Sequence, residues 1–116
     1  MSDYVLNLDD VNQWLESRKD SLVEGVGLAD VRSTTKSLPG ARADFDASNR
    51  MGRISIWISG EVDFEVLSTG DSNFAFFRHE KISSLNDPSL QSAYQEFLKI
   101  MSRNTQLRDV AGRDPA

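Results

Sequence analysis

The stretch that decides the fold is residues 52–66, Gly-Arg-Ile-Ser-Ile-Trp-Ile-Ser-Gly-Glu-Val-Asp-Phe-Glu-Val. Its apolar residues recur at every second position on both sides of a Ser-Gly pair, which is the pattern of two β-strands joined by a turn. In the second strand the acids Glu61, Asp63 and Glu65 therefore emerge on one face, and the apolar residues between them emerge on the other. The sequence predicts a hairpin with an apolar face for the core and an acidic face toward solvent.

The length of the turn sets the pairing of these two strands. A loop of residues 59–60 would put the isoleucines of the first strand on the same face as the acids. A loop of residues 59–61 instead pairs Ile58 with Val62 and separates apolar from charged side chains. Because burial selects the register that keeps one face apolar, we expect the second arrangement, with Trp57 on the acidic face.

The same alternation extends to both sides of the hairpin. Strands are predicted over residues 28–35, 41–47, 51–58, 62–67 and 74–81. An amphipathic helix is expected over residues 8–24, with Asn7 as its N-cap. A second helix is expected from Pro88, after the N-cap Asp87, with a broad apolar stripe.

Strands that follow one another through short turns form an antiparallel meander. The predicted fold class is therefore α+β, a five-stranded antiparallel meander sheet with an N-terminal and a C-terminal helix packed on one face. Residues 1–105 are expected to form a single domain, whose length is sufficient for one core. Residues 106–116 are expected to form a polar, flexible tail.

Composition narrows the classes of partner. The chain has 116 residues, a formal net charge of −5 and a pI of about 4.7. A phosphate backbone would be repelled on average, so a nucleic-acid partner is not expected, whereas a basic protein partner would be attracted. No apolar run approaches the ~20 residues that cross a bilayer, and no signal peptide is evident, so we expect no membrane partner and a cytoplasmic location.

Residues for catalysis are scarce. The chain has no cysteine, and His79 is its one histidine, so neither a zinc site nor a serine-histidine-acid set can be built. Gly25-Val26-Gly27 precedes a strand pattern rather than a helix, which fails the context of a dinucleotide-binding loop. The strand acids have three interpretations: a solvated face, a protein-binding patch, or a site for a hard cation or acid-base chemistry. We predict no catalytic residue, metal or cofactor.

The candidate site is therefore a protein-binding face. Its predicted partner-binding residues are Asp44, Asp46, Trp57, Glu61, Asp63 and Glu65. A tryptophan on an open acidic face has the profile of an interface anchor, although it could equally pack beneath a loop or a helix end. Phe77 has the same two interpretations, because alternation sends it to the opposite face from its aromatic neighbours.

The sequence resembles a known family. Residues 52–84, with the hairpin above followed by Phe-Phe-Arg-His-Glu at 76–80, resemble the TriTu-type immunity proteins. The early helix containing Trp14-Leu15-Glu16 and the late helix around Phe97 fit the same outline. The resemblance implies a bacterial cytoplasmic antitoxin that neutralises the toxic C-terminal domain of a polymorphic toxin, often an Rhs-type effector delivered by a type VI secretion system.

For TriTu the implied toxin is an ADP-ribosyltransferase that uses NAD to modify elongation factor Tu. The resemblance offers no catalytic residues to transfer. We therefore expect a non-enzymatic protein that occludes its cognate toxin in a 1:1 complex. The sequence leaves two alternatives open: a secretion chaperone or adaptor for an effector, and an ADP-ribosyl hydrolase that reverses the modification.

Overall fold

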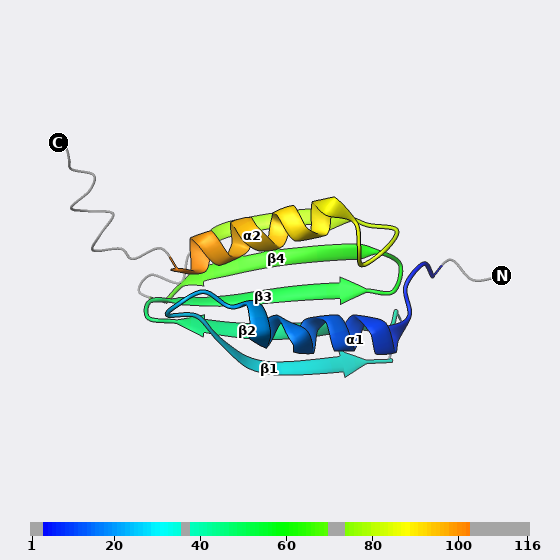
Figure 1. Ribbon diagram of the computed structural model, residues 1–116, viewed down its shortest axis with the longest axis horizontal. Helices are drawn as coiled ribbons and strands as arrows, with labels where there is room; N and C mark the ends of the chain where they lie inside the picture. The colour runs from blue at the N-terminus through cyan, green and yellow to red at the C-terminus, as the bar shows by residue number, and fades with distance from the viewer. Residues whose placement is uncertain (1–3, 36–37, 70–73, 103–116) are drawn as a thin grey trace.

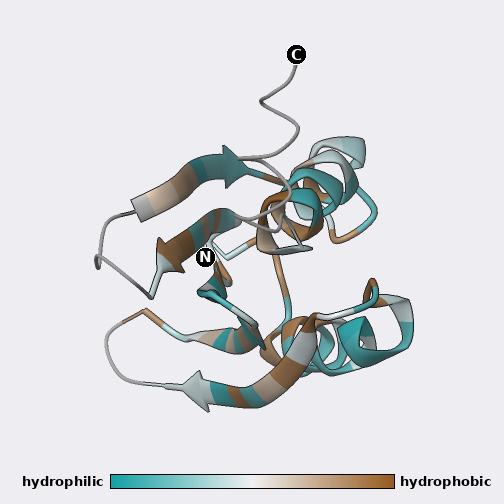
Figure 2. Ribbon diagram, turned by 90° about the vertical axis from the view of Figure 1, so that its left-hand side faces the viewer, coloured by the Kyte–Doolittle hydropathy of each residue, from teal (hydrophilic) through white to brown (hydrophobic). Residues whose placement is uncertain are grey.

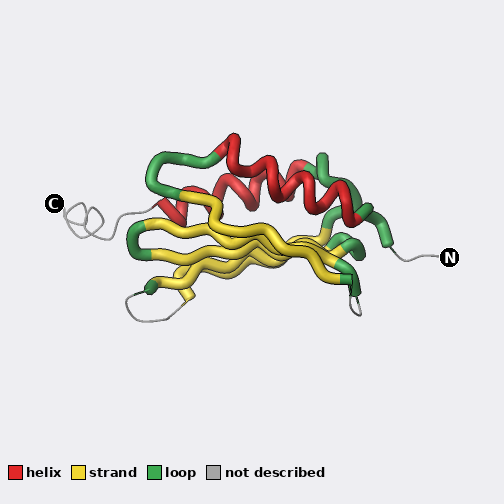
Figure 3. The backbone as a smooth tube through the Cα atoms, turned by 90° about the horizontal axis from the view of Figure 1, so that it is seen from below, coloured by secondary structure: helices red, strands yellow, loops and turns green. Residues whose placement is uncertain are grey.

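The computed structural model describes residues 4–35, 38–69 and 74–102, so the predicted tail over 106–116 lies outside the described residues. Two α-helices flank five strands: α1 (Leu8–Glu16), β1 (Gly27–Thr34), β2 (Gly40–Ala47), β3 (Arg50–Trp57), β4 (Glu61–Ser68), β5 (Phe74–Lys81) and α2 (Pro88–Ser102). The strands form one antiparallel sheet in the order β1-β2-β3-β4-β5. Both helices lie on the same face of it, which confirms the predicted α+β meander (Figures 1 and 3).

The core fills the space between the helices and the sheet. α1 packs mainly on β1 and β2, and α2 packs on β4 and β5. Apolar and polar positions alternate along the strands, as Figure 2 shows, so each strand sends one set of side chains toward the helices. Phe97 of α2 contacts Phe45 edge-on, with ring centroids 5.1 Å apart. The apolar stripe of α2 is fully buried: Leu90, Ala93, Tyr94, Phe97, Leu98 and Met101.

Both expected helix starts are present. Oδ1 of Asn7 accepts a hydrogen bond of 3.1 Å from the amide of Asp10, three residues into α1. Oδ1 of Asp87 accepts one of 2.9 Å from the amide of Ser89, beside Pro88 in the first turn of α2. These bonds satisfy amide groups that have no partner within the helix.

The first helix is shorter than the sequence suggested. The prediction of a helix over 8–24 was wrong, because α1 ends at Glu16 and a 3₁₀ turn, η1 (Ser17–Ser21), follows. The hydroxyl of Ser17 and Nε of Arg18 both donate to the carbonyl of Trp14, at 2.8 and 2.9 Å. These side-chain bonds compete with backbone amides for the carbonyl of Trp14. They lie in the last turn of the helix, where 3₁₀ geometry is common. The Arg18 guanidinium then lies 3.9 Å from the centroid of the Trp14 ring.

The pairing of β3 with β4 corrects the predicted register. Val62 pairs with Ile56, not with Ile58, so the prediction was wrong by two residues. The assignment of faces was nevertheless correct, because a shift of two residues preserves the alternation. Ile58 joins the turn instead, where its amide donates to the carbonyl of Pro39 at 3.0 Å. Gly60 closes the turn with a left-handed φ of 101°, and its amide donates to the carbonyl of Trp57 at 2.8 Å.

Candidate functional site

The predicted site residues share one surface. The face of the sheet without helices, called the open face from here on, is the lower side in Figure 3. Alternation along β2, β3 and β4 places every predicted site residue on this face: Asp44, Asp46, Trp57, Glu61, Asp63 and Glu65. The sequence therefore identified the correct side of the sheet for these residues, although their role as a binding site remains a prediction.

The acids are interleaved with basic groups from neighbouring strands. The register places Arg53 of β3 between Asp44 of β2 and Glu65 of β4. Nε of Arg53 donates to Oδ1 of Asp44 at 2.7 Å, and Nε of Arg42 lies 3.6 Å from Oδ2 of the same carboxylate. The hydrogen bond to Asp44 is the main cause of a raised pKa of Arg53, which therefore stays charged. The open face is thus a mixed-charge surface rather than a continuous acidic one.

The same interleaving continues toward β5. Asp63 lies opposite His79, with Oδ1 and Nδ1 2.6 Å apart, and Glu61 lies opposite Lys81. By contrast, Asp46, Glu61 and Glu65 form no ion pair within the described residues. These three carboxylates are therefore the acids of the open face that are most available to a positively charged partner.

Trp57 lies at one end of the open face and is half-buried. Its side chain packs over Gly40 of β2, where a Cβ atom would come 3.0 Å from Cδ1 of the indole. The indole therefore covers a glycine of the neighbouring strand. This arrangement lies between the two interpretations of Trp57 from the sequence, an exposed interface anchor and a side chain packed beneath a loop or helix end. Part of its surface remains available for contact with another molecule.

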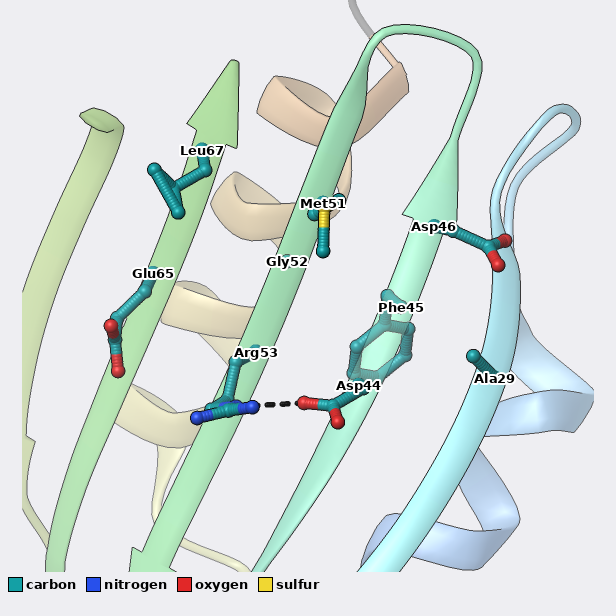
Figure 4. Close-up of a pocket in the computed structure, with 9 residues that line it drawn as sticks. All are labelled: Ala29, Asp44, Phe45, Asp46, Met51, Gly52, Arg53, Glu65 and Leu67. Atoms are coloured by element: carbon teal, nitrogen blue, oxygen red, sulfur yellow. Dashed lines mark hydrogen bonds and ion pairs between the residues drawn. The ribbon is translucent and has the colours of Figure 1, made fainter. Parts of the chain in front are cut away.

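A cavity of about 300 Å³ lies toward the other end of the open face. Its lining comes from four strands, as Figure 4 shows: Ala29, Asp44, Phe45, Asp46, Met51, Gly52, Arg53, Glu65 and Leu67. Met51 and Phe77 are both 57% exposed on this face. Met51 and Leu67 were absent from the predicted site. A signal for them exists in the sequence, because both are apolar at positions where the alternation expects polar residues.

The described residues offer neither a metal site nor a membrane-spanning helix. Within residues 4–35, 38–69 and 74–102, no group of three or more histidine, cysteine or acidic residues is arranged to hold a metal ion. Over these ranges, no helix combines the length and apolar character needed to cross a membrane.

These features define a small α+β protein with a broad, helix-free sheet face that carries charged and apolar side chains. Among known families, the model described as "Immunity protein TriTu" matches residues 9–100, which extend from the first turn of α1 almost to the end of α2. The chain therefore belongs to the TriTu family of immunity proteins, a class that neutralises toxins. No curated protein and no solved structure matches the chain.

Proposed function

We propose that this immunity protein binds a cognate toxin domain through its open face and blocks either the active site or the surface that recognises the toxin's target. The observation that supports this most is the open face itself, a broad sheet surface with paired charges, exposed apolar side chains and a cavity. From the TriTu family we infer that the toxin is an ADP-ribosyltransferase acting on elongation factor Tu. The protein would then act in the cytoplasm, where its target works.

Charged side chains on this face would speed association with the toxin and align the two proteins. Basic side chains that a toxin uses to bind NAD phosphates or its target protein would be attracted by Asp46, Glu61 and Glu65. Such complementarity raises the rate of association more than it lowers the rate of dissociation. Asp44 and Asp63 are already fixed by Arg53 and His79, so they would lose little conformational freedom on binding.

Apolar contacts would serve affinity. Trp57 is a candidate anchor, since tryptophan is enriched among the residues that dominate binding energy. Self-protection requires nearly complete inhibition, which corresponds to a Kd of about 1 nM or lower, on the order of −12 kcal/mol. Such affinity needs buried apolar surface as well as charge.

The proposal is tested by adding this protein to an ADP-ribosylation reaction that contains the toxin domain encoded next to its gene, elongation factor Tu and labelled NAD. We expect labelling to stop sharply at one equivalent. Removal of label from modified factor by substoichiometric protein would instead indicate a hydrolase. Labelling that continues unchanged, although the toxin binds, would indicate an adaptor. Either result would overturn the proposal.

A charge-reversal pair locates the surface. Asp63→Lys with Glu65→Lys should weaken toxin binding and slow association. The matched control is Glu16→Lys with Asp20→Lys, which makes the same change in net charge on the helical side of the molecule. If both pairs weaken binding equally, net charge rather than the open face is responsible. If the first pair binds and protects as the wild type does, the open face is not the binding surface.

A further inference from the structure

Apolar side chains interrupt the polar open face mainly at the end away from Trp57. Met51 of β3 lies directly opposite Leu67 of β4. Phe77 of β5 pairs with Glu65, two residues before Leu67, so Phe77 and Leu67 lie diagonally across the β4–β5 pair on the same face. Together Met51, Leu67 and Phe77 form an apolar patch, and the first two also line the cavity.

This end of the sheet is shaped by irregular pairing at both edges. In β1, Ala29 is an extra residue between the pairs that Leu28 and Asp30 form with β2. In β5, Ala75 is an extra residue opposite the step from Val66 to Leu67. A bulge increases the local twist of its strand and is common next to functional sites. Both bulges fall at the level of the cavity, and Ala29 forms part of its wall.

The exposure of the patch is unusual for the molecule. Among the described residues, the large apolar side chains that are exposed are Tyr4, Val5, Val23, Met51 and Phe77. Tyr4 and Val5 precede α1, and Val23 lies in the loop before β1, whereas Met51 and Phe77 extend from the strands β3 and β5. Exposed apolar side chains grouped in one patch and bordered by polar residues mark interaction sites.

The charges around the cavity determine which charge is favoured on a partner group that binds there. Three carboxylates and one guanidinium line it, from Asp44, Asp46, Glu65 and Arg53. Nε of Arg53 donates to Asp44 at 2.7 Å, the bond drawn in Figure 4, whereas Asp46 and Glu65 at the rim form no ion pair within the described residues. A positively charged group beside the cavity would therefore be favoured.

The size of the cavity limits what enters it. About 300 Å³ is at the lower end of the range for small-molecule sites, ~300–1,000 Å³. Met51 in its lining and Phe77, which pairs with the lining residue Glu65, also expose apolar side chains at this end of the face. A single side chain presented by a protein surface fits both features.

We propose that this end of the open face receives one large apolar side chain of the toxin, flanked by a lysine or arginine that pairs with Asp46 or Glu65. The inserted side chain packs against Met51 and Leu67, and its neighbours lie on Phe77. This inference rests on the proposed function and adds to it the position of the main apolar contact and the chemistry of the toxin segment. It places the contact at the Met51 end of the face rather than at Trp57.

The first test measures binding of the toxin domain by variants of the full chain. Met51→Ser with Phe77→Ser should raise the Kd by about 30-fold or more, the effect expected from losing hot-spot contacts. Both side chains are more than half exposed, and thermal unfolding of the variant verifies its fold. Val23→Ser, at an exposed apolar position on the loop before β1, is the matched control and should bind as the wild type does. Asp46→Asn with Glu65→Gln should mainly slow association and reduce its dependence on salt.

The second test observes the contact directly. The chain has three methionines, of which Met51 is exposed and Met101 is buried in the core. With methyl-labelled methionine, addition of the toxin domain should shift the NMR signal of Met51 and leave that of Met101 nearly unchanged. Intermolecular contacts from the Met51 methyl group to an aromatic or aliphatic side chain of the toxin would support the insertion of an apolar toxin side chain here.

The outcomes separate this inference from the proposed function. If the wild type inhibits the toxin, but the Met51 and Phe77 variant binds equally well and the Met51 signal does not move, the inference is wrong and the proposed function stands. If the wild-type chain does not bind the toxin domain, both are wrong.

Discussion

Arg53 and Asp44 are joined across β3 and β2 by a hydrogen bond of 2.7 Å from Nε to Oδ1, in the wall of the cavity on the open face. The bond raises the pKa of Arg53 and holds its guanidinium toward β2. Glu65, on the other side of Arg53, forms no ion pair within the described residues. The single cation of this site is thus directed toward one acid and leaves the other available.

Replacing Arg53 should therefore speed capture of a basic partner. Arg53→Gln removes the positive charge from the cavity rim, so association with the toxin domain should accelerate several-fold at low ionic strength and less at high salt. Stability should change by less than about 1 kcal/mol, because the pair is solvent-exposed. Stopped-flow association kinetics measure the first effect. Arg32→Gln, which removes an exposed charge of the edge strand β1, is the control, and an equal acceleration there would argue against a local effect.

The close approach of α2 to the sheet depends on Gly52. A Cβ atom at this position would lie 2.7 Å from Cζ of Phe97 and 2.6 Å from Sδ of Met101. We expect Gly52→Ala to destabilise the fold by about 1–3 kcal/mol, the usual cost of overpacking a core. Urea unfolding measures this. Phe97→Leu should cost less in the Gly52→Ala background than in the wild type, and additive costs would show that the two residues do not compete for space.

The turn between β3 and β4 should tolerate no side chain at Gly60. Its φ of 101° is left-handed, and a Cβ atom there would collide with the backbone carbonyl of Ile82. Gly25 has a similar φ of 88° but open space around it. Gly25→Ala should thus cost only the backbone strain, roughly 1–2 kcal/mol, and Gly60→Ala should cost clearly more. If the two variants lose equal stability in thermal unfolding experiments, the carbonyl of Ile82 moves aside to accept the new side chain.

Stability at high pH should depend on Tyr94. Burial raises the pKa of its phenol above the ordinary value of 10.0, and its hydroxyl lies 3.1 Å from Oγ of Ser21. The folded chain therefore holds the phenol proton more tightly than the unfolded chain does. The stabilisation that this provides is complete below pH 10 and is lost as the pH rises through the folded-state pKa.

Tyr94→Phe removes both the hydroxyl contact and this titration. At pH 7 the variant should be less stable than the wild type by about 0.5–1.5 kcal/mol. The difference should shrink as the pH rises above 10, because only the wild type then loses stability through this group. Urea unfolding of both proteins over this pH range measures it, and a constant difference would contradict the assignment. Lysine titration in the same range affects both proteins alike.

The sequence by itself determined the elements and their faces. Alternation in 52–66 assigned Glu61, Asp63 and Glu65 to one side of the sheet, and the caps Asn7 and Asp87 located both helix starts. These features depend on neighbours within a few residues, so the local pattern carries them. Where a feature depended on competing contacts, local reasoning failed, as in the length of the first helix and the pairing of Ile58.

Only the tertiary structure decided what the open face presents. It placed Arg53 between Asp44 and Glu65, brought His79 to Asp63, and put Met51 opposite Leu67. It also aligned the bulges of β1 and β5 at one end of the sheet, where the cavity forms. The physical reason is that alternation along a strand fixes the face of a residue. Its neighbours on that face are set by the registers of separate strand pairs, which depend on turns and packing elsewhere in the chain.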